Sequence, residues 1–255
     1  MKFLIFPLAL LFSITPVFAE SDILIVQSPS MEQIVFDGKW SFKEEWKTSG
    51  YDTIQFEDGN YFKLRSAHYG NFTYFHINFV SDTHEDLFED KAMICFDSSN
   101  NKSEIFDSDD YCFEIIHNES SHLIQSNFEV DNNSFKKEYH DKFIGVSNMS
   151  DIKDRYSKTP HMTYEFKIPT DVIGRSSIYG FYILLHDNNS NSTYSWPHSV
   201  KQETYEISSP SKWGQLISPD KTLPEFSFSF LLYLIIPLSM GLFFLTKNRF
   251  GKITF

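Results

Sequence analysis

Two uncharged apolar stretches, one at each end of the chain, leave only the polar segment between them to fold as a globular domain. The first follows Lys2, and Val17 and Ala19 occupy the −3 and −1 positions of a signal-peptide cleavage site. The second, residues 226–246, is long enough to cross a bilayer as a helix, and basic residues follow it. We therefore expect a signal peptide (1–19), a transmembrane helix (226–246) and a cytoplasmic basic tail (247–255), with the domain displayed at the cell surface.

The remaining residues divide into an N-terminal segment (20–30), one domain (31–217) and a short linker (218–225). All 34 acidic residues lie in this part of the chain, whereas four of the 22 basic residues lie in the end segments. Such an acidic surface disfavours nucleic acid and anionic lipid as partners and suits cations or cationic partners. The alternative is a surface charge that serves only solubility or adaptation to a salty medium.

Short strands rather than amphipathic helices are predicted for the domain. Aromatic residues make up 17% of the chain, and aromatic and β-branched side chains favour strands. Residues 60–69 and 72–80 read as a hairpin about Gly70-Asn71, and apolar Phe75, Ile77 and Phe79 alternate with polar residues, which predicts one buried face. Further strands are expected over 91–96, 111–117, 122–130, 162–168, 178–186 and 203–207, with a helical turn at 42–46. Many short strands between turns indicate an all-β antiparallel sandwich.

The two cysteines of the chain, Cys95 and Cys112, predict one disulfide, because an even count in an exported protein favours pairing. On the chain-entropy model this bond would stabilise the fold by roughly 3 kcal/mol. Asn-x-Ser/Thr sequons also fit export, since they are glycosylation acceptors in a secreted chain, although individual ones can instead be turn asparagines. The sequons are at Asn71, Asn101, Asn118, Asn132, Asn148, Asn188 and Asn191.

The sequence lacks the short motifs of several large enzyme classes. It contains no Gly-x-Ser-x-Gly, no His-Glu-x-x-His, no P-loop and no dinucleotide-binding fingerprint. Its histidines show no ligand-like pairing on a helix. We therefore expect a protein that is not an enzyme.

Six spaced motifs follow one another in a recognisable order. They are Asp37-Gly38 with Glu45-Trp46, the strand 72–80 with Asp82, the segment Asp90-Lys91-Ala92-Met93-Ile94, the segment Glu165-Phe166-Lys167-Ile168-Pro169, the strand 180–186 with Asp187, and Trp213-Gly214. Over residues 31–217 this series resembles the family 9 carbohydrate-binding modules and their DOMON-like relatives, which include haem-binding subunits of the ethylbenzene dehydrogenase type. The resemblance implies a β-sandwich of jelly-roll-like topology and a binding role.

The same motifs have a physical interpretation without the family. Asp37-Gly38 is a turn signal. Trp40 and Trp46 are expected as core or lid aromatics rather than as ligand platforms. Glu165 lies between aromatic residues on a strand, where it is either part of a solvated face or a buried carboxylate that holds the opening loop.

A glycan is the first ligand that we expect, because a pyranose needs an aromatic face with fixed polar groups around it. Trp196 lies in an Asn/Ser-rich segment close to His186, Asp187 and His198, and these four residues form the predicted sugar site. Sugar-binding members of the family use two tryptophans, and the second is not identified here.

Two other functions remain open. The resemblance to haem-binding relatives implies a membrane-anchored b-type haem electron carrier, with Met93 as one axial ligand and His84 or His186 as the other. The competing interpretation of Met93 is a core residue. The third possibility is a structural cell-envelope protein without a small ligand.

Calcium is a candidate cofactor for the acidic loop between the two cysteines. The loop offers Asp97, Asp107, Asp109 and Asp110, and hard oxygen ligands on a pinned loop suit Ca²⁺. Asp82, Asp86 and Asp90 form a second acidic run. The alternative is an ordinary solvated acidic loop.

The tail carries a further resemblance. Leu223-Pro224-Glu225-Phe226, the apolar stretch and the basic residues after it resemble the Pro-Glu-Phe sorting signals of archaeal surface proteins. This resemblance implies that a sortase-like enzyme replaces the anchor with lipid.

Overall fold

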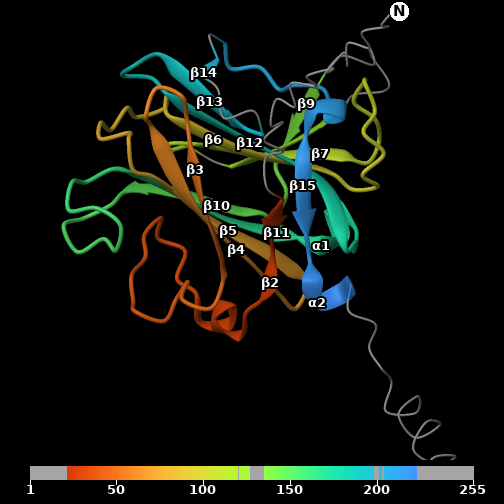
Figure 1. The fold of residues 1–255 in the computed structure, drawn as a ribbon, viewed down its shortest axis with the longest axis horizontal. Helices are drawn as coiled ribbons and strands as arrows, with labels where there is room; N and C mark the ends of the chain where they lie inside the picture. Colours follow the sequence, from red (N-terminus) through yellow and green to blue (C-terminus); the bar gives the residue numbers. More distant parts are fainter. Residues whose placement is uncertain (1–21, 120, 127–134, 198–200, 203, 223–255) are drawn as a thin grey trace, which may run out of the picture.

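The computed structural model describes residues 22–222, apart from residues 120, 127–134, 198–200 and 203. These residues form two facing β-sheets, one of nine strands and one of six (Figure 1). The all-β prediction is therefore confirmed, and the pairing is antiparallel except at two short strands. The expected signal peptide, membrane helix and basic tail lie outside the described residues. Within the described part of the chain, no helix is long and apolar enough to cross a membrane.

The larger sheet is ordered β1-β15-β12-β6-β7-β8-β9, with β13 also beside β12 and β14 beside β13. Its strands are β1 (Ile23–Leu24), β15 (Gly214–Ile217), β12 (Ile178–Asp187), β6 (Lys91–Asp97), β7 (Asp110–Ile116), β8 (His122–Ser126), β9 (Phe135–Glu138), β13 (Ser192–Trp196) and β14 (Lys201–Gln202).

The smaller sheet is ordered β10-β11-β5-β4-β2, with β3 also paired to β4. Its strands are β10 (Ile144–Met149), β11 (Met162–Pro169), β5 (Phe72–Phe79), β4 (Tyr61–Tyr69), β2 (Val26–Gln27) and β3 (Gly50–Gln55). The helical turns are short: η1 (Pro29–Gln33), α1 (Thr170–Ile173), η2 (Pro210–Lys212) and α2 (Pro219–Thr222).

The N-terminal segment joins the two sheets. β1 pairs in parallel with β15 of the larger sheet, and β2, directly after it, pairs in parallel with β4 of the smaller sheet. The sandwich thus includes residues before position 31, since β1 and β2 are both strands of it.

The core lies between the sheets and is built largely from aromatic rings. Phe75 of β5 lies 5.4 Å from Phe181 of β12 between ring centroids, and Phe96 of β6 lies 5.3 Å from Phe181. All three side chains are fully buried. The high aromatic content is therefore used to fill the space between two pleated faces.

β5 is buried on both faces, so the prediction of a single buried face is wrong. Its polar residues His76 and Asn78 are as inaccessible as Phe75. The reason is residues 28–49, the opening loop, which crosses the outer face of the smaller sheet and packs Met31 and Trp46 against it. Successive side chains of a strand point to opposite faces, and here both faces are covered.

The outer face of the larger sheet is also partly covered. The predicted disulfide is confirmed: Cys95 and Cys112 are bonded between directly opposed positions of β6 and β7. Tyr205 and Ile207 pack against these cysteines and their neighbours. Residues 204–207 are not a strand, contrary to the prediction for 203–207, because they run over the sheet instead of pairing with it.

Candidate functional site

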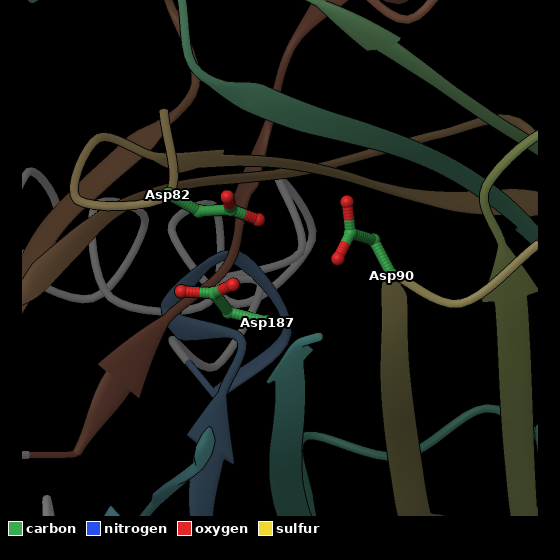
Figure 2. A group of neighbouring side chains, drawn as sticks. All are labelled: Asp82, Asp90 and Asp187. Atoms are coloured by element: carbon green, nitrogen blue, oxygen red, sulfur yellow. The ribbon is translucent and has the colours of Figure 1, made fainter. Parts of the chain in front are cut away.

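Three buried aspartates meet at one end of the sandwich. Asp82 lies in the turn after β5, Asp90 directly precedes β6, and Asp187 is the last residue of β12. Each offers a carboxylate oxygen within 4.8 Å of the other two, and Figure 2 shows the three carboxyl groups facing a common space. We call these residues the carboxylate cluster. They come from both sheets, so a ligand held there would tie the two sheets together.

Hydrogen bonds fix two of the three carboxylates. Asp90 accepts from the backbone N–H groups of Asp86 (2.8 Å) and Asn188 (3.1 Å). Asp187 accepts from the backbone N–H of Ser190 (3.1 Å) and from its hydroxyl (2.7 Å). These contacts hold the carboxylates in place but leave lone pairs free.

Asp82 and Tyr164 bring unsatisfied oxygens to the same region. Oδ1 of Asp82 accepts a long bond from the His84 backbone N–H (3.3 Å), while Oδ2 has no hydrogen-bond partner among the described residues. The hydroxyl of Tyr164, on β11, is likewise buried and unpartnered there. Buried polar atoms without partners are costly, which makes these oxygens informative.

The electrostatics of the cluster oppose three bare negative charges. Burial, followed by the neighbouring Asp90 and Asp187 charges, raises the pKa of Asp82 to about 8. Burial also raises the pKa of Asp90 to about 6, against the effect of its backbone hydrogen bonds. Burial and then the charges of the cluster hold the pKa of Tyr164 well above its usual value. A cation among the carboxylates would remove the repulsion and let all three ionise.

The donor set fits a hard divalent cation. Three carboxylates, without imidazole or thiolate ligands, suit Ca²⁺, which accepts six to eight oxygens in flexible geometry. Zinc would favour nitrogen or sulfur ligands. Asp82, Asp90 and Asp187 are thus the residues that could hold Ca²⁺, and the cation would offset the unpartnered oxygen of Asp82.

The acidic loop that we predicted as a calcium site is held by its own backbone. Asp97 accepts from the N–H groups of Asn101 (3.2 Å) and Lys102 (2.9 Å), and Asp109 accepts from Ser99 (3.0 Å). Asp107 accepts from the Asp109 N–H, and one oxygen of Asp110 accepts from the Asp107 N–H, while Oδ1 of Asp110 is buried without a partner among the described residues. Among the described residues, only the carboxylate cluster brings together three or more side chains that could bind one metal ion. Calcium binding at the acidic loop therefore stays a prediction.

The predicted sugar residues do not form one exposed site. Trp196 is 3% exposed and packs against Phe181 with ring centroids 5.9 Å apart. His186 is bonded through Nδ1 to the Thr193 hydroxyl at 3.0 Å, and Asp187 belongs to the carboxylate cluster. His198 lies outside the described residues. The ring of Trp196 is a core element in this conformation, and its role in sugar binding is an untested prediction.

Of the predicted haem ligands, Met93 and His186 lie on the same face of the larger sheet, because His186 is two residues beyond Leu184, which is directly opposite Met93. Met93 is 2% exposed and packs among Cys95, Tyr182 and Trp213 on the outer face of the larger sheet. His84 is exposed in the loop between β5 and β6. This packing is what the core interpretation of Met93 expects, and the haem alternative rests on the sequence resemblance alone.

A group of aromatic rings, one exposed and three half-buried, lies on the outer face of the smaller sheet. Tyr51 of β3 is 46% exposed and stacks on Tyr156, with ring centroids 6.0 Å apart and planes at 10°. Trp40 of the opening loop meets Tyr156 edge-on at 6.0 Å, and Tyr61 lies on the neighbouring strand β4. We call Trp40, Tyr51, Tyr61 and Tyr156 the aromatic surface. Ring faces with hydroxyl groups at their edges are what a pyranose can stack on.

A cavity of about 190 Å³ adjoins Trp40. The residues that line it are Lys39, Trp40, Ser41, Ser150, Asp151, Lys153 and Asp154. Its polar lining could bind the hydroxyl groups of a sugar next to the aromatic surface.

The asparagines of the described sequons differ in how accessible they are for glycosylation. Asn71, Asn101, Asn118 and Asn191 are exposed, and Asn118 and Asn191 have positive φ angles, as turn asparagines often do. The side-chain amide of Asn148 donates to the Asp37 carbonyl at 3.1 Å, so a glycan there would displace this contact. Asn132 lies outside the described residues.

Sequence reasoning found the components of the carboxylate cluster but not the cluster. Asp82 and Asp90 stood in an acidic run, and Asp187 was assigned to a sugar site. The available signal was that Asp82 and Asp187 each follow or end a buried strand and Asp90 precedes one. The aromatic surface was missed because β3 was not predicted. Its signal was the period-two pattern Tyr61, Lys63, Arg65, which points one way along β4.

The fold and the site define a class: an all-β sandwich with a buried carboxylate cluster at one end and an exposed aromatic surface on one sheet. No family model matches the chain, and no curated protein matches it. Solved structures similar to it include a family 9 carbohydrate-binding module from Caldicellulosiruptor kristjanssonii in complex with cellotriose, 13% identical, with a TM-score of 0.47 over 78% of this chain and 93% of that one. The corresponding glucose complex is 13% identical, with a TM-score of 0.48 over 78% and 95%. This likeness is too distant to transfer a ligand or a site residue.

Proposed function

We propose that this chain is a non-catalytic glycan-binding β-sandwich, displayed outside the cell on a C-terminal membrane anchor. The observation that supports glycan binding is the aromatic surface, in which Tyr51 is 46% exposed although Tyr156 and the Arg65 guanidinium lie against its ring. An exposed aromatic group beside a polar cavity supplies both the stacking face and the hydrogen-bonding groups that a sugar requires.

Display outside the cell rests on the sequence and on one structural feature. The signal peptide and the apolar span supply export and attachment, and the Cys95–Cys112 disulfide fits an oxidising compartment. Processing of the anchor at the Pro-Glu-Phe motif is part of this proposal. Intact-mass analysis of the native protein decides it, since retention of residues 226–255 excludes processing.

We also assign a structural Ca²⁺ to the carboxylate cluster. Its part in the proposed function is to fix the ends of β5, β6 and β12 and so preserve the sandwich that carries the aromatic surface. No catalytic step is assigned to the cation.

Binding of the full-length protein to an array of neutral and acidic polysaccharides, with Ca²⁺ and with EDTA, tests the function. We expect retention on at least one polysaccharide and release by the free oligosaccharide. Lack of retention on every polysaccharide in both conditions would overturn the proposal and leave a structural envelope protein.

A further inference from the structure

Three cations lie within the aromatic surface. Nζ of Lys63 lies 5.5 Å from the ring centroid of Tyr51 and 5.4 Å from that of Tyr61. The guanidinium carbon of Arg65 lies 4.3 Å from the Tyr51 centroid, and that of Arg155 lies 4.2 Å from the Trp40 centroid. Each cation therefore stands over a ring, at a separation typical of cation–π contacts.

Uncharged groups provide the hydrogen bonds of these cations. Lys63 Nζ donates to the hydroxyls of Tyr51 (2.9 Å) and Thr53 (3.1 Å). Arg65 Nε donates to the Tyr156 hydroxyl at 2.7 Å, and an Arg155 guanidinium N–H donates to the Lys43 carbonyl at 3.2 Å.

In the described part of the chain, none of the three cations forms an ion pair with a carboxylate, although ion pairs occur elsewhere, as between Lys142 and Asp171. The acidic residue of β3, Asp52, alternates with Tyr51 and Thr53 and so points to the opposite face of the strand, although its charge still interacts with that of Arg65. In a chain of net charge −12, a surface that concentrates cations without carboxylate partners is a local exception.

We propose that the aromatic surface binds an anionic glycan, whose sugar rings stack on Tyr51 while its carboxylate or sulfate groups pair with Lys63, Arg65 and Arg155. The inference rests on the proposed glycan-binding function and specifies its ligand class. Guanidinium and ammonium groups form short charge-assisted hydrogen bonds with carboxylate and sulfate oxygens, and Arg can do so with two parallel bonds. A neutral sugar would add no charged partner to Lys63, whereas the charges of Arg65 and Arg155 already interact at longer range with Asp52 and Glu44.

The setting favours a glycan over other polyanions. Nucleic acid binding needs charge neutralisation along many phosphates, which three cations on a chain of net charge −12 do not supply. An acidic polypeptide could satisfy the cations, but it offers no pyranose face to stack on Tyr51. The adjoining cavity also presents the charged side chains of Lys39, Asp151 and Lys153, which can hydrogen-bond to sugar hydroxyls.

Calorimetric titration of the full-length protein against two matched ligand pairs tests the inference. The pairs are polygalacturonate with its methyl ester, and dextran sulfate with dextran, so that carboxylate and sulfate are examined separately. Poly-L-glutamate serves as a polyanion without sugar rings. We expect at least one acidic glycan to bind about tenfold more tightly than its neutral partner, with an affinity that falls as salt is raised.

Three charge variants locate the effect. Lys63→Gln and Arg65→Gln should each weaken acidic-glycan binding about three- to fivefold, the range for a partly exposed ion pair. Lys63→Arg should retain binding. Lys167→Gln is the matched control, because Lys167 also lies over a ring, 4.2 Å from the Phe72 centroid, but outside the aromatic surface. Unchanged melting temperatures confirm that the variants fold.

The outcomes separate the inference from the proposed function. Equal affinity for a polysaccharide and its neutral partner would overturn the inference and leave glycan binding intact, as would equal losses from Lys63→Gln and Lys167→Gln. Tight binding of poly-L-glutamate alone would overturn it in favour of a polypeptide. Absence of binding to all four polysaccharides and to the wider array would overturn the proposed function itself.

Discussion

Oε1 of Glu165, on β11, accepts a hydrogen bond of 3.1 Å from the indole Nε1 of Trp46 in the opening loop. Its second oxygen accepts from the backbone N–H groups of Gly38 (2.9 Å) and Asp37 (3.2 Å). Glu165 is fully buried. Of the two interpretations left open by the sequence, the structure selects the buried carboxylate that holds the opening loop.

Replacement of Glu165 tests this role. Glu165→Ala should lower the free energy of unfolding by roughly 2–3 kcal/mol, because it leaves several buried donors without an acceptor. Glu165→Gln should cost less, since an amide oxygen can still accept and burial already raises the pKa of Glu165 well above its usual value. Urea unfolding measures both, with Glu57→Ala, at an exposed turn, as the control. A Glu165→Ala loss no larger than that of Glu57→Ala would contradict the role.

Calcium binding distinguishes the carboxylate cluster from the acidic loop. Saturating Ca²⁺ should raise the melting temperature of the protein, and a ligand at 100 times its Kd stabilises by roughly 2.7 kcal/mol. Asp82→Asn should abolish this rise, whereas Asp107→Asn, in the acidic loop, should leave it unchanged. The opposite pattern would place calcium at the acidic loop. A melting temperature that changes with neither Ca²⁺ nor EDTA would contradict calcium binding at both places.

The metal-free protein should lose stability as the pH rises from 6.5 to 8.5. Burial raises the pKa of Asp82 to about 8 and that of Asp110 to about 7, from an ordinary value of 3.8, so the folded state binds more protons than the unfolded state between 3.8 and these raised values. His76 has the opposite effect on stability at lower pH. Burial lowers its pKa from 6.5 to about 3, so between these values the unfolded state binds the extra proton, and stability falls as the pH falls below 6.5.

Thermal melts in EDTA across this window measure the effect. Asp82→Asn should flatten the decline, and Ca²⁺ should protect more at pH 8 than at pH 6.5, because the cation requires the ionised carboxylates. A metal-free melting temperature that rises toward pH 8.5 would contradict the raised pKa values.

The disulfide should contribute measurably to stability although it joins strands that are already paired. Replacement of both Cys95 and Cys112 by Ala should reduce the free energy of unfolding by roughly 2–4 kcal/mol. Both side chains are buried, so the alanines also remove packing. Denaturant unfolding of this variant and of the oxidised protein gives the difference, and equal stabilities would show that the strand pairing alone suffices.

The strands with strong periodicity could be predicted from the sequence. β4, β5, β6, β7, β11 and β12 lie close to the expected positions, because alternation and turn residues such as Gly70-Asn71 are local signals. β3, β9, β10, β13 and β15 are among the strands that the sequence did not predict. In β3 and β13, Asp52 and the serines lower the strand propensity, and pairing with partner strands overrides it. The burial of His76 depends on the opening loop, a contact that no local pattern contains.

The candidate sites also divide into those that the sequence could predict and those that depend on tertiary contacts. Cys95 and Cys112 could be paired from their number alone, whereas the meeting of Asp82, Asp90 and Asp187 requires the register of β6 with β12 and the approach of the opposite sheet. Trp196 was predicted to bind sugar because it is a tryptophan in a polar segment. Instead, its ring packs in the core against Phe181, which lies on the neighbouring strand β12.

The affinity of the Tyr51→Ala protein for the polysaccharide that the full-length chain retains tests the central claim most directly. Tyr139→Ala is the matched control, because Tyr139 is 74% exposed and lies outside the aromatic surface. Loss of one stacking ring should weaken binding about tenfold in Tyr51→Ala and leave Tyr139→Ala unchanged. Equal affinity of the two variants would contradict glycan binding at the aromatic surface.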